Sequence, residues 1–132
     1  MNIRSTSIAA LFAALAAALP GIATPAAADV RLVMVEQPGC VWCVRWDAEV
    51  GDAYALTTEG RVAPLHRVNL HSPLPDGFNY ARPPVFTPTF ILFNDGAEVG
   101  RIEGYPGEDF FWPLLARLIE GLPAEKQEVS KR

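Results

Sequence analysis

Residues 30–43 read VRLVMVEQPGCVWC, and this stretch contains the strongest structural signal in the chain. Its first six residues are apolar almost without interruption and rich in β-branched side chains, which is typical of a central strand covered on both faces. The Gln-Pro-Gly sequence at 37–39 ends that strand. From Cys40 onward apolar residues recur at steps of three and four, which indicates a helix. The stretch therefore predicts a strand, a turn and a helix that opens on a Cys-x-x-Cys motif.

The helix after this turn is expected to bury one side. Its apolar residues are Cys43, Val44, Trp46, Val50 and Tyr54. Gly51 is expected to weaken or end the helix, because glycine is a poor helix former. Residues 57–60, Thr-Thr-Glu-Gly, are expected to form a loop or a final irregular turn.

A second strand and a long irregular segment follow. Residues 64–70 form a short alternating strand, and two strands joined by one helix make a parallel unit with a right-handed crossover. Residues 71–87 contain four prolines, so little regular structure is expected there. A loop of this length inside a small domain is usually functional.

The C-terminal half predicts a hairpin and a helix. Residues 89–93 form an apolar strand, Asn-Asp-Gly at 94–96 is a hairpin turn, and residues 98–103 return as a fourth strand. The order of elements predicts the α/β class, in the form of a small sandwich with a mixed four-stranded sheet.

The last helix is marked at its start by acidic residues. Glu108 and Asp109 suit a helix N-terminus, and Pro113 is expected either to start the helix or to kink it. One apolar stripe follows the helix: Phe111, Leu114, Leu115, Leu118 and Leu122.

Residues 1–28 differ in composition from the rest of the chain. They contain one charged residue, Arg4, then an apolar run at 8–19 and three alanines at 26–28. These are the three parts of a secretory signal peptide, and the run is shorter than the roughly 20 residues of a membrane-spanning helix. We therefore predict a signal peptide at 1–28, one domain at 29–122 and a polar, frayed tail at 123–132.

The charge of the chain excludes some partner classes. Its net charge is −4, and half of its residues are apolar. Nucleic acids and anionic membranes are recognised by basic patches, so neither is an expected partner.

The Cys-x-x-Cys motif gives its two sulfurs different surroundings. Cys40 opens the helix, where free backbone N–H groups and the positive end of the helix dipole favour the nucleophilic thiolate. Cys43 lies one turn further along and is expected to be the more buried. In thiol–disulfide exchange, an exposed Cys40 would attack a partner disulfide and Cys43 would then displace the partner.

Other uses of the motif require features that the chain lacks. Haem attachment needs histidine after the second cysteine, where Val44 stands, and a four-cysteine zinc site needs a second pair. A purely structural disulfide gains little from closing so short a loop. Two alternatives stay open: Cu(I) binding or delivery by the same thiolates, which soft sulfur favours, and a non-catalytic interaction domain.

A second motif, Thr87-Pro88-Thr89, precedes the third strand. Cys40 and Cys43 after one strand, with this proline before another, resemble the thioredoxin superfamily. The resemblance implies that Pro88 is cis and lies against the cysteine pair, where its missing N–H keeps a groove open for substrate backbone. It implies no cofactor or metal beyond a redox-active disulfide. We predict a substrate groove made of Trp42, Thr87 and Pro88, in which the resemblance implies the role of Pro88.

The resemblance is narrower in three segments, which look like the SoxS-type periplasmic proteins of the bacterial sulfur-oxidation (Sox) system: residues 36–40, 64–69 and 100–112. That branch implies a periplasmic thiol–disulfide oxidoreductase, expected as a monomer. Its substrate would be a protein with an exposed cysteine or disulfide, namely a sulfur carrier of thiosulfate oxidation that it reduces and reactivates. A membrane electron donor would re-reduce the cysteines. A general periplasmic disulfide reductase or isomerase is the alternative.

The chain departs from the thioredoxin pattern around the cysteines. Met34 stands where thioredoxins bury an aspartate that helps to move the proton of the second cysteine. Glu36 could substitute through water, although a solvated carboxylate at the strand end is the simpler interpretation. Gly39 replaces a tryptophan, and Val41 and Trp42 replace Gly-Pro. Trp42 is expected either to dock a partner or to fold back over the sulfurs.

The remaining candidates are interpreted as surface or packing residues. Surface positions are expected for His66, Arg67 and His71. Packing positions are expected for Trp46, Phe110, Phe111 and Trp112.

Overall fold

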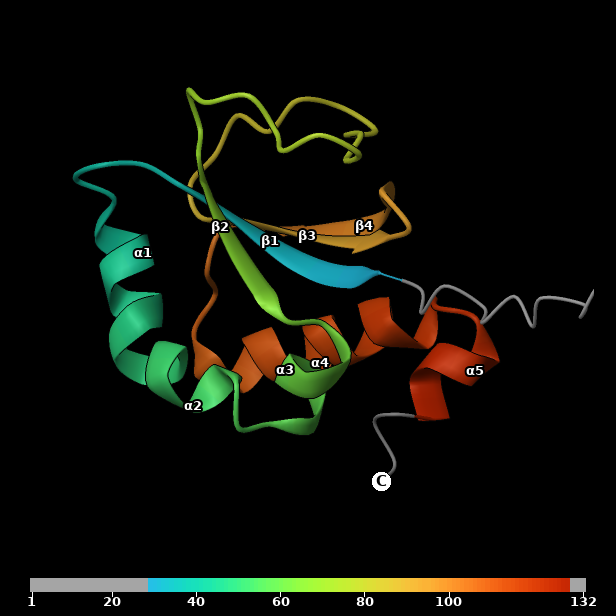
Figure 1. The fold of residues 1–132 in the computed structure, drawn as a ribbon. Helices are drawn as coiled ribbons and strands as arrows, with labels where there is room; N and C mark the ends of the chain where they lie inside the picture. Colours follow the sequence, from blue (N-terminus) through green and yellow to red (C-terminus); the bar gives the residue numbers. More distant parts are fainter. Residues whose placement is uncertain (1–28, 129–132) are drawn as a thin grey trace, which may run out of the picture.

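The structure is a computed structural model that describes residues 29–128 (Figure 1). The predicted signal peptide at 1–28 and the last four residues of the predicted tail lie outside the described residues. Across the described part of the chain, no helix combines the length and apolar character needed to cross a membrane.

Four strands form one mixed sheet in the order β2-β1-β3-β4. Their bounds are Val30–Glu36 for β1, Leu65–Asn69 for β2, Thr89–Asn94 for β3 and Ala97–Glu103 for β4. β1 pairs parallel with β2 and antiparallel with β3, and β3 pairs antiparallel with β4. The predicted mixed sheet is confirmed, and β1 occupies a central position with an almost wholly buried side-chain pattern.

The turn between β3 and β4 uses two left-handed residues, Asp95 at φ 50° and Gly96 at φ 79°. Such a turn matches the twist of the flanking strands. A Cβ atom at position 96 would lie 1.8 Å from the carbonyl oxygen of Gly77, so the long loop passes directly over this turn. Glycine is required here by both conformation and space.

The helix after the cysteines extends to Tyr54, the last residue of the predicted apolar repeat. It runs as α1 (Val41–Trp46), a π-helical turn η1 (Asp47–Gly51) and α2 (Asp52–Tyr54). Gly51 therefore does not end it, and the buried Tyr54 completes its inner side. Val44 was expected on the apolar side and is instead exposed.

Residues 57–60 form neither the predicted loop nor an irregular turn. Thr57 caps a short helix, α3 (Thr58–Val62), by accepting a hydrogen bond at its Oγ1 from the Gly60 amide at 3.0 Å. A threonine whose side chain accepts a hydrogen bond from the amide three residues later is a signal for the start of a helix. The loop-like composition of Thr-Thr-Glu-Gly concealed this signal.

The last long helix, α4 (Glu108–Glu120), begins at the acidic pair and contains Pro113 in its interior. The predicted start at Glu108 and Asp109 is confirmed, and of the two alternatives for Pro113, a helix start near the proline is excluded. Its buried side is formed by Phe111, Leu115 and Ile119, whereas Leu114 is partly exposed. The tail does not fray at once: α5 (Ala124–Gln127) follows, and Lys126 Nζ pairs with Asp95 Oδ2 at 3.0 Å.

The two faces of the sheet are covered differently (Figure 1). The helices cover the face that carries Leu32, Met34 and Phe90, and this side holds the larger core. The opposite face is covered by the segment between β2 and β3 instead of by a helix. Its buried residues are Val33, Val35, Val68, Ile91 and Phe93, against which Leu70, Leu74, Phe78 and Tyr80 pack.

Candidate active site

Cys40 and Cys43 form a disulfide with an S–S distance of 2.08 Å at the start of the first helix. Cys40 is the N-cap of α1, and its Sγ accepts a hydrogen bond from the Cys43 amide at 3.1 Å. A sulfur in this position faces the amides that an α-helix leaves unpaired, and these stabilise negative charge. The strand, turn and helix predicted around the motif place it at the carboxyl end of β1.

Both cysteines are largely buried in the disulfide form. Cys40 is 9% exposed and Cys43 is 4% exposed. The predicted order is confirmed, but the expectation of an exposed Cys40 is wrong for this form. In this form Cys40 Sγ is bonded to Cys43 and contacts its amide, and both cysteines belong to the buried core cluster.

The Thr87-Pro88 peptide bond is cis, as predicted. Gln37 Nε2 donates a hydrogen bond to Thr87 Oγ1 at 2.9 Å, and the Gly104 amide donates to the Pro88 carbonyl oxygen at 2.8 Å. Gln37 lies three residues before Cys40, so its hydrogen bond joins the two predicted motifs directly. Pro88 is buried, while Thr87 is partly exposed.

Trp42, between the cysteines, is 51% exposed. The guanidinium of Arg45 lies over its ring at 5.6 Å from the centroid, a cation–π arrangement. Of the two expected roles for Trp42, this position suits partner contact better than cover of the sulfurs. Val41 beside it and Phe86 before Thr87 are also exposed apolar side chains.

The carboxylates nearest the motif in sequence are held by Arg67. Met34 is fully buried, so no carboxylate occupies that position on β1. Arg67 Nε donates to Glu36 Oε1 at 3.1 Å, and its Nη1 donates to Asp47 Oδ1 at 2.7 Å. Arg67 is exposed, as expected for a surface charge, and it also ties β1 and β2 to the helix one turn after Cys43.

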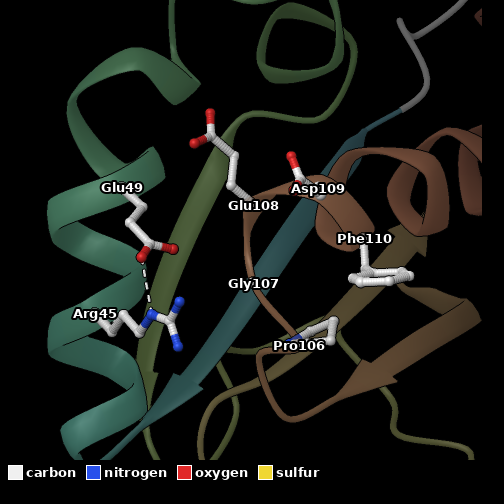
Figure 2. A pocket seen from close by; sticks show the side chains of 7 residues that line it. All are labelled: Arg45, Glu49, Pro106, Gly107, Glu108, Asp109 and Phe110. Carbon is white, nitrogen blue, oxygen red and sulfur yellow. Dashed lines mark hydrogen bonds and ion pairs between the residues drawn. The ribbon is translucent and has the colours of Figure 1, made fainter.

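A shallow pocket of about 340 Å³ lies between the first helix and the start of α4 (Figure 2). Arg45 Nε pairs with Glu49 Oε1 at 2.8 Å on one wall, and Glu108, Asp109 and Phe110 form the other. These residues were not predicted as part of a site. The i,i+4 spacing of Arg45 and Glu49 is the sequence signal that could have indicated their pairing.

Tyr105 connects this pocket to the loop after β4. Its hydroxyl donates to Glu49 Oε2 at 2.6 Å. This hydrogen bond, together with Arg45, lowers the pKa of Glu49, whereas burial and the neighbouring Glu49 raise the pKa of Tyr105. The hydrogen bond links the helix that carries the cysteines to the loop that contacts Pro88.

Comparison with protein-family models and with curated proteins gave no match. Among solved structures, the crystal structure of the periplasmic thioredoxin SoxS from Paracoccus pantotrophus, in its reduced form, is 60% identical in sequence. The match covers 70% of this chain and 97% of that one, with a TM-score of 0.69. The chain belongs to the SoxS-type thioredoxins. It is a thiol–disulfide oxidoreductase with the thioredoxin-like fold.

The other candidate residues of this thioredoxin occupy surface or core positions. His66 and His71 are exposed, Trp46 and Phe111 are fully buried, and Phe110 is exposed instead of packed. Trp112 stacks on Tyr54 with ring centroids 6.1 Å apart. Within residues 29–128, no group of three or more His, Cys, Asp and Glu side chains gathers in a form that could hold a metal ion.

We expect alkylation of the reduced protein to distinguish its two thiols. At mildly acidic pH, iodoacetamide should modify Cys40 at least about tenfold faster than Cys43, because the helix N-terminus stabilises the Cys40 thiolate. Peptide mass spectrometry over a time course measures both rates. Equal rates would contradict the assignment of Cys40 as the nucleophile.

Proposed function

We propose that this thioredoxin reduces disulfides of a protein partner, with Cys40 as the attacking and Cys43 as the resolving cysteine. The N-cap position of Cys40 Sγ is the observation that carries the proposal. The Cys40 thiolate attacks one sulfur of the partner disulfide, forms a mixed disulfide and releases the other partner sulfur as a thiolate. Cys43, after losing its proton, attacks Cys40 Sγ and releases the second partner sulfur. Two electrons pass to the partner, and the Cys40–Cys43 disulfide remains.

Trp42, Thr87 and Pro88 form the proposed substrate groove. Proline has no N–H, so position 88 leaves the approach to the disulfide free of a competing donor. Thr87 is held by Gln37 through its side chain, and we assign its backbone groups to the bound partner strand. The half-exposed Trp42 supplies an aromatic contact on the other side.

We infer that the enzyme works in the periplasm on a sulfur-carrier protein of the Sox system, whose cysteine it frees from a disulfide or stray sulfur adduct. SoxS of P. pantotrophus is a periplasmic thioredoxin, and the signal-peptide pattern at 1–28 agrees with that location. A membrane electron donor re-reduces the cysteines, and the enzyme acts as a monomer.

Position 34 is occupied by Met34 and not by an acidic residue, and this supports a function with one dedicated protein partner. Without a buried carboxylate at that position to accept its proton, Cys43 should resolve the mixed disulfide slowly, which favours one well-fitting partner over many. The enzyme is then only a modest general disulfide reductase.

Recovery of an inactivated sulfur carrier tests this function. The reduced wild-type protein should restore carrier activity at least about tenfold faster than it reduces unrelated protein disulfides, and Cys40→Ser should restore none. Equally fast reduction of many unrelated disulfides would reject the dedicated partner while leaving the oxidoreductase chemistry intact.

A further inference from the structure

The segment at 70–88, which joins β2 to β3, is attached to β4 at successive points. The Asn79 amide donates to the Gly96 carbonyl oxygen at 2.9 Å, and Asn79 forms a parallel bridge with Ala97. The Ala81 amide donates to Glu98 Oε2 at 2.8 Å. The segment therefore runs beside β4 and is held there partly by side chains in place of a strand ladder.

Arg101 is the central member of this attachment. Its side chain is only 5% exposed, as is that of Glu98, with which its Nε pairs at 2.7 Å. Its Nη2 donates to Glu98 Oε2 at 2.7 Å and to the Arg82 carbonyl oxygen at 2.6 Å. Its Nη1 is buried without a hydrogen-bond partner among the described residues, although it lies 3.8 Å from Glu103 Oε1.

A buried ion pair is a poor source of net stability, because removing both charges from water offsets most of their attraction. An arginine with one buried nitrogen unsatisfied is still less favourable on that account. The Glu98–Arg101 pair instead fixes backbone atoms of the segment at 70–88, which has no strand ladder of its own. Arg82, whose carbonyl oxygen Arg101 binds, also pairs through Nη2 with Glu103 Oε1 at 2.6 Å.

The fixed backbone lies five residues before Thr87. Pro83 and Pro84 follow Arg82, and their locked φ angles limit how the chain can move between these points. Val85 and Phe86 come next and are 68% and 58% exposed. At the far end Thr89 Oγ1 donates to the Phe86 carbonyl oxygen at 2.7 Å, so the exposed pair is held from both sides.

We propose that Arg101 is a positioning residue for partner binding: it anchors residues 81–82 so that Val85 and Phe86 stand beside Thr87-Pro88 as an apolar contact for the partner. The matching feature of the partner is an apolar side chain close to its reactive cysteine. This inference rests on the proposed function, because it concerns the same groove. A small disulfide reaches the cysteines without that contact, whereas a protein disulfide needs it.

Stopped-flow oxidation of the pre-reduced enzyme tests the proposal with two probes, insulin as a protein disulfide and dithionitrobenzoate as a small one. Arg101→Gln should raise the half-saturating insulin concentration at least about fivefold and change the limiting rate less than twofold. Its rate with dithionitrobenzoate should also change less than twofold. Arg101→Lys, which keeps the charge without the two-pronged geometry, should fall between Gln and wild type.

Phe86→Ala provides the second arm. It should raise the half-saturating insulin concentration like Arg101→Gln, and the double variant should show no further rise, because both changes remove one contact. If Arg101→Gln does not fold, Glu103→Gln weakens the same anchor from a more exposed position and should shift the insulin value in the same direction. Arg31→Gln is the matched control, since it breaks an ion pair at the start of β1, the end away from the cysteines, and should change neither probe.

Three results would overturn the proposal: an unchanged half-saturating insulin concentration, an equal loss with both probes, or multiplied effects in the double variant. Failure of wild type with both probes would instead reject the proposed function. If the wild type reacts with both probes, and the folded Arg101→Gln and Glu103→Gln variants react as it does, only the role of Arg101 is rejected.

Discussion

Replacing Cys40 with serine should lower the rate of partner reduction by at least about a thousandfold, because the variant lacks the attacking sulfur. Cys43→Ser should differ in kind. It retains the first attack and should stop at the mixed disulfide, because no second thiol is present to release the partner. Non-reducing gels should show a covalent complex with Cys43→Ser and none with Cys40→Ser.

The double variant with both cysteines changed to serine is the control for non-specific trapping. It should bind no partner covalently, and its unfolding temperature in the absence of reductant should show how much the disulfide itself stabilises the fold. Trapping by Cys40→Ser instead of Cys43→Ser would reverse the two assignments. Equal partner reduction by wild type and the double variant would reject thiol chemistry altogether.

Phe111→Ala should destabilise the protein by about 3–5 kcal/mol, the range for removing a fully buried aromatic side chain. Phe111 is fully buried, and its ring lies 4.9 Å from that of Phe90 and 5.8 Å from that of Trp46, centroid to centroid. It therefore joins α4 to β3 and to the helix that carries the cysteines. For a domain of this size the melting temperature should fall by on the order of 20 °C.

The neighbouring Phe110 is a matched control for that substitution. It is the same residue type, one position earlier on α4, and is 65% exposed. Phe110→Ala should change the free energy of unfolding by less than about 1 kcal/mol in urea titrations. Similar losses for the two variants would mean that the aromatic cluster is not the centre of the core.

Local patterns were sufficient to predict the elements that hold the site. The continuous apolar run at 30–35 predicted a central strand, and Asn-Asp-Gly at 94–96 predicted the hairpin turn, whereas the order of the strands within the sheet was not predicted. The apolar residues at steps of three and four after Cys40 predicted the helix that carries the cysteine motif. The cis conformation of Pro88 came from the family resemblance, since no local pattern distinguishes cis from trans.

The features that the sequence did not predict depend on residues far apart in the chain. Arg67 contacts Glu36 and Asp47, which are 31 and 20 positions away, and neither separation has a periodic signature. No local pattern distinguishes Arg101 from other polar residues on an outer strand, because its contact with the Arg82 carbonyl oxygen depends on the path of the segment at 70–88. The burial of Cys40 likewise depends on its bond to Cys43 and its place in the core cluster, which residue type alone does not encode.

Because the segment at 70–88 both covers one face of the sheet and leads to the cis proline, changes in partner recognition also affect the stability of the fold. One segment supplies Phe78 and Tyr80 to pack on Phe93 and also leads to the cis proline. Where a helix covers a sheet, a neighbouring recognition loop can drift without exposing the core. Here a substitution that moves the segment at 70–88 to fit a new partner also exposes the apolar face of the sheet beneath it. We therefore expect such substitutions to be retained only together with compensating substitutions on β3 or β4. Lineages that switch partners should therefore change the loop and these two strands together, while the cysteine helix stays as it is.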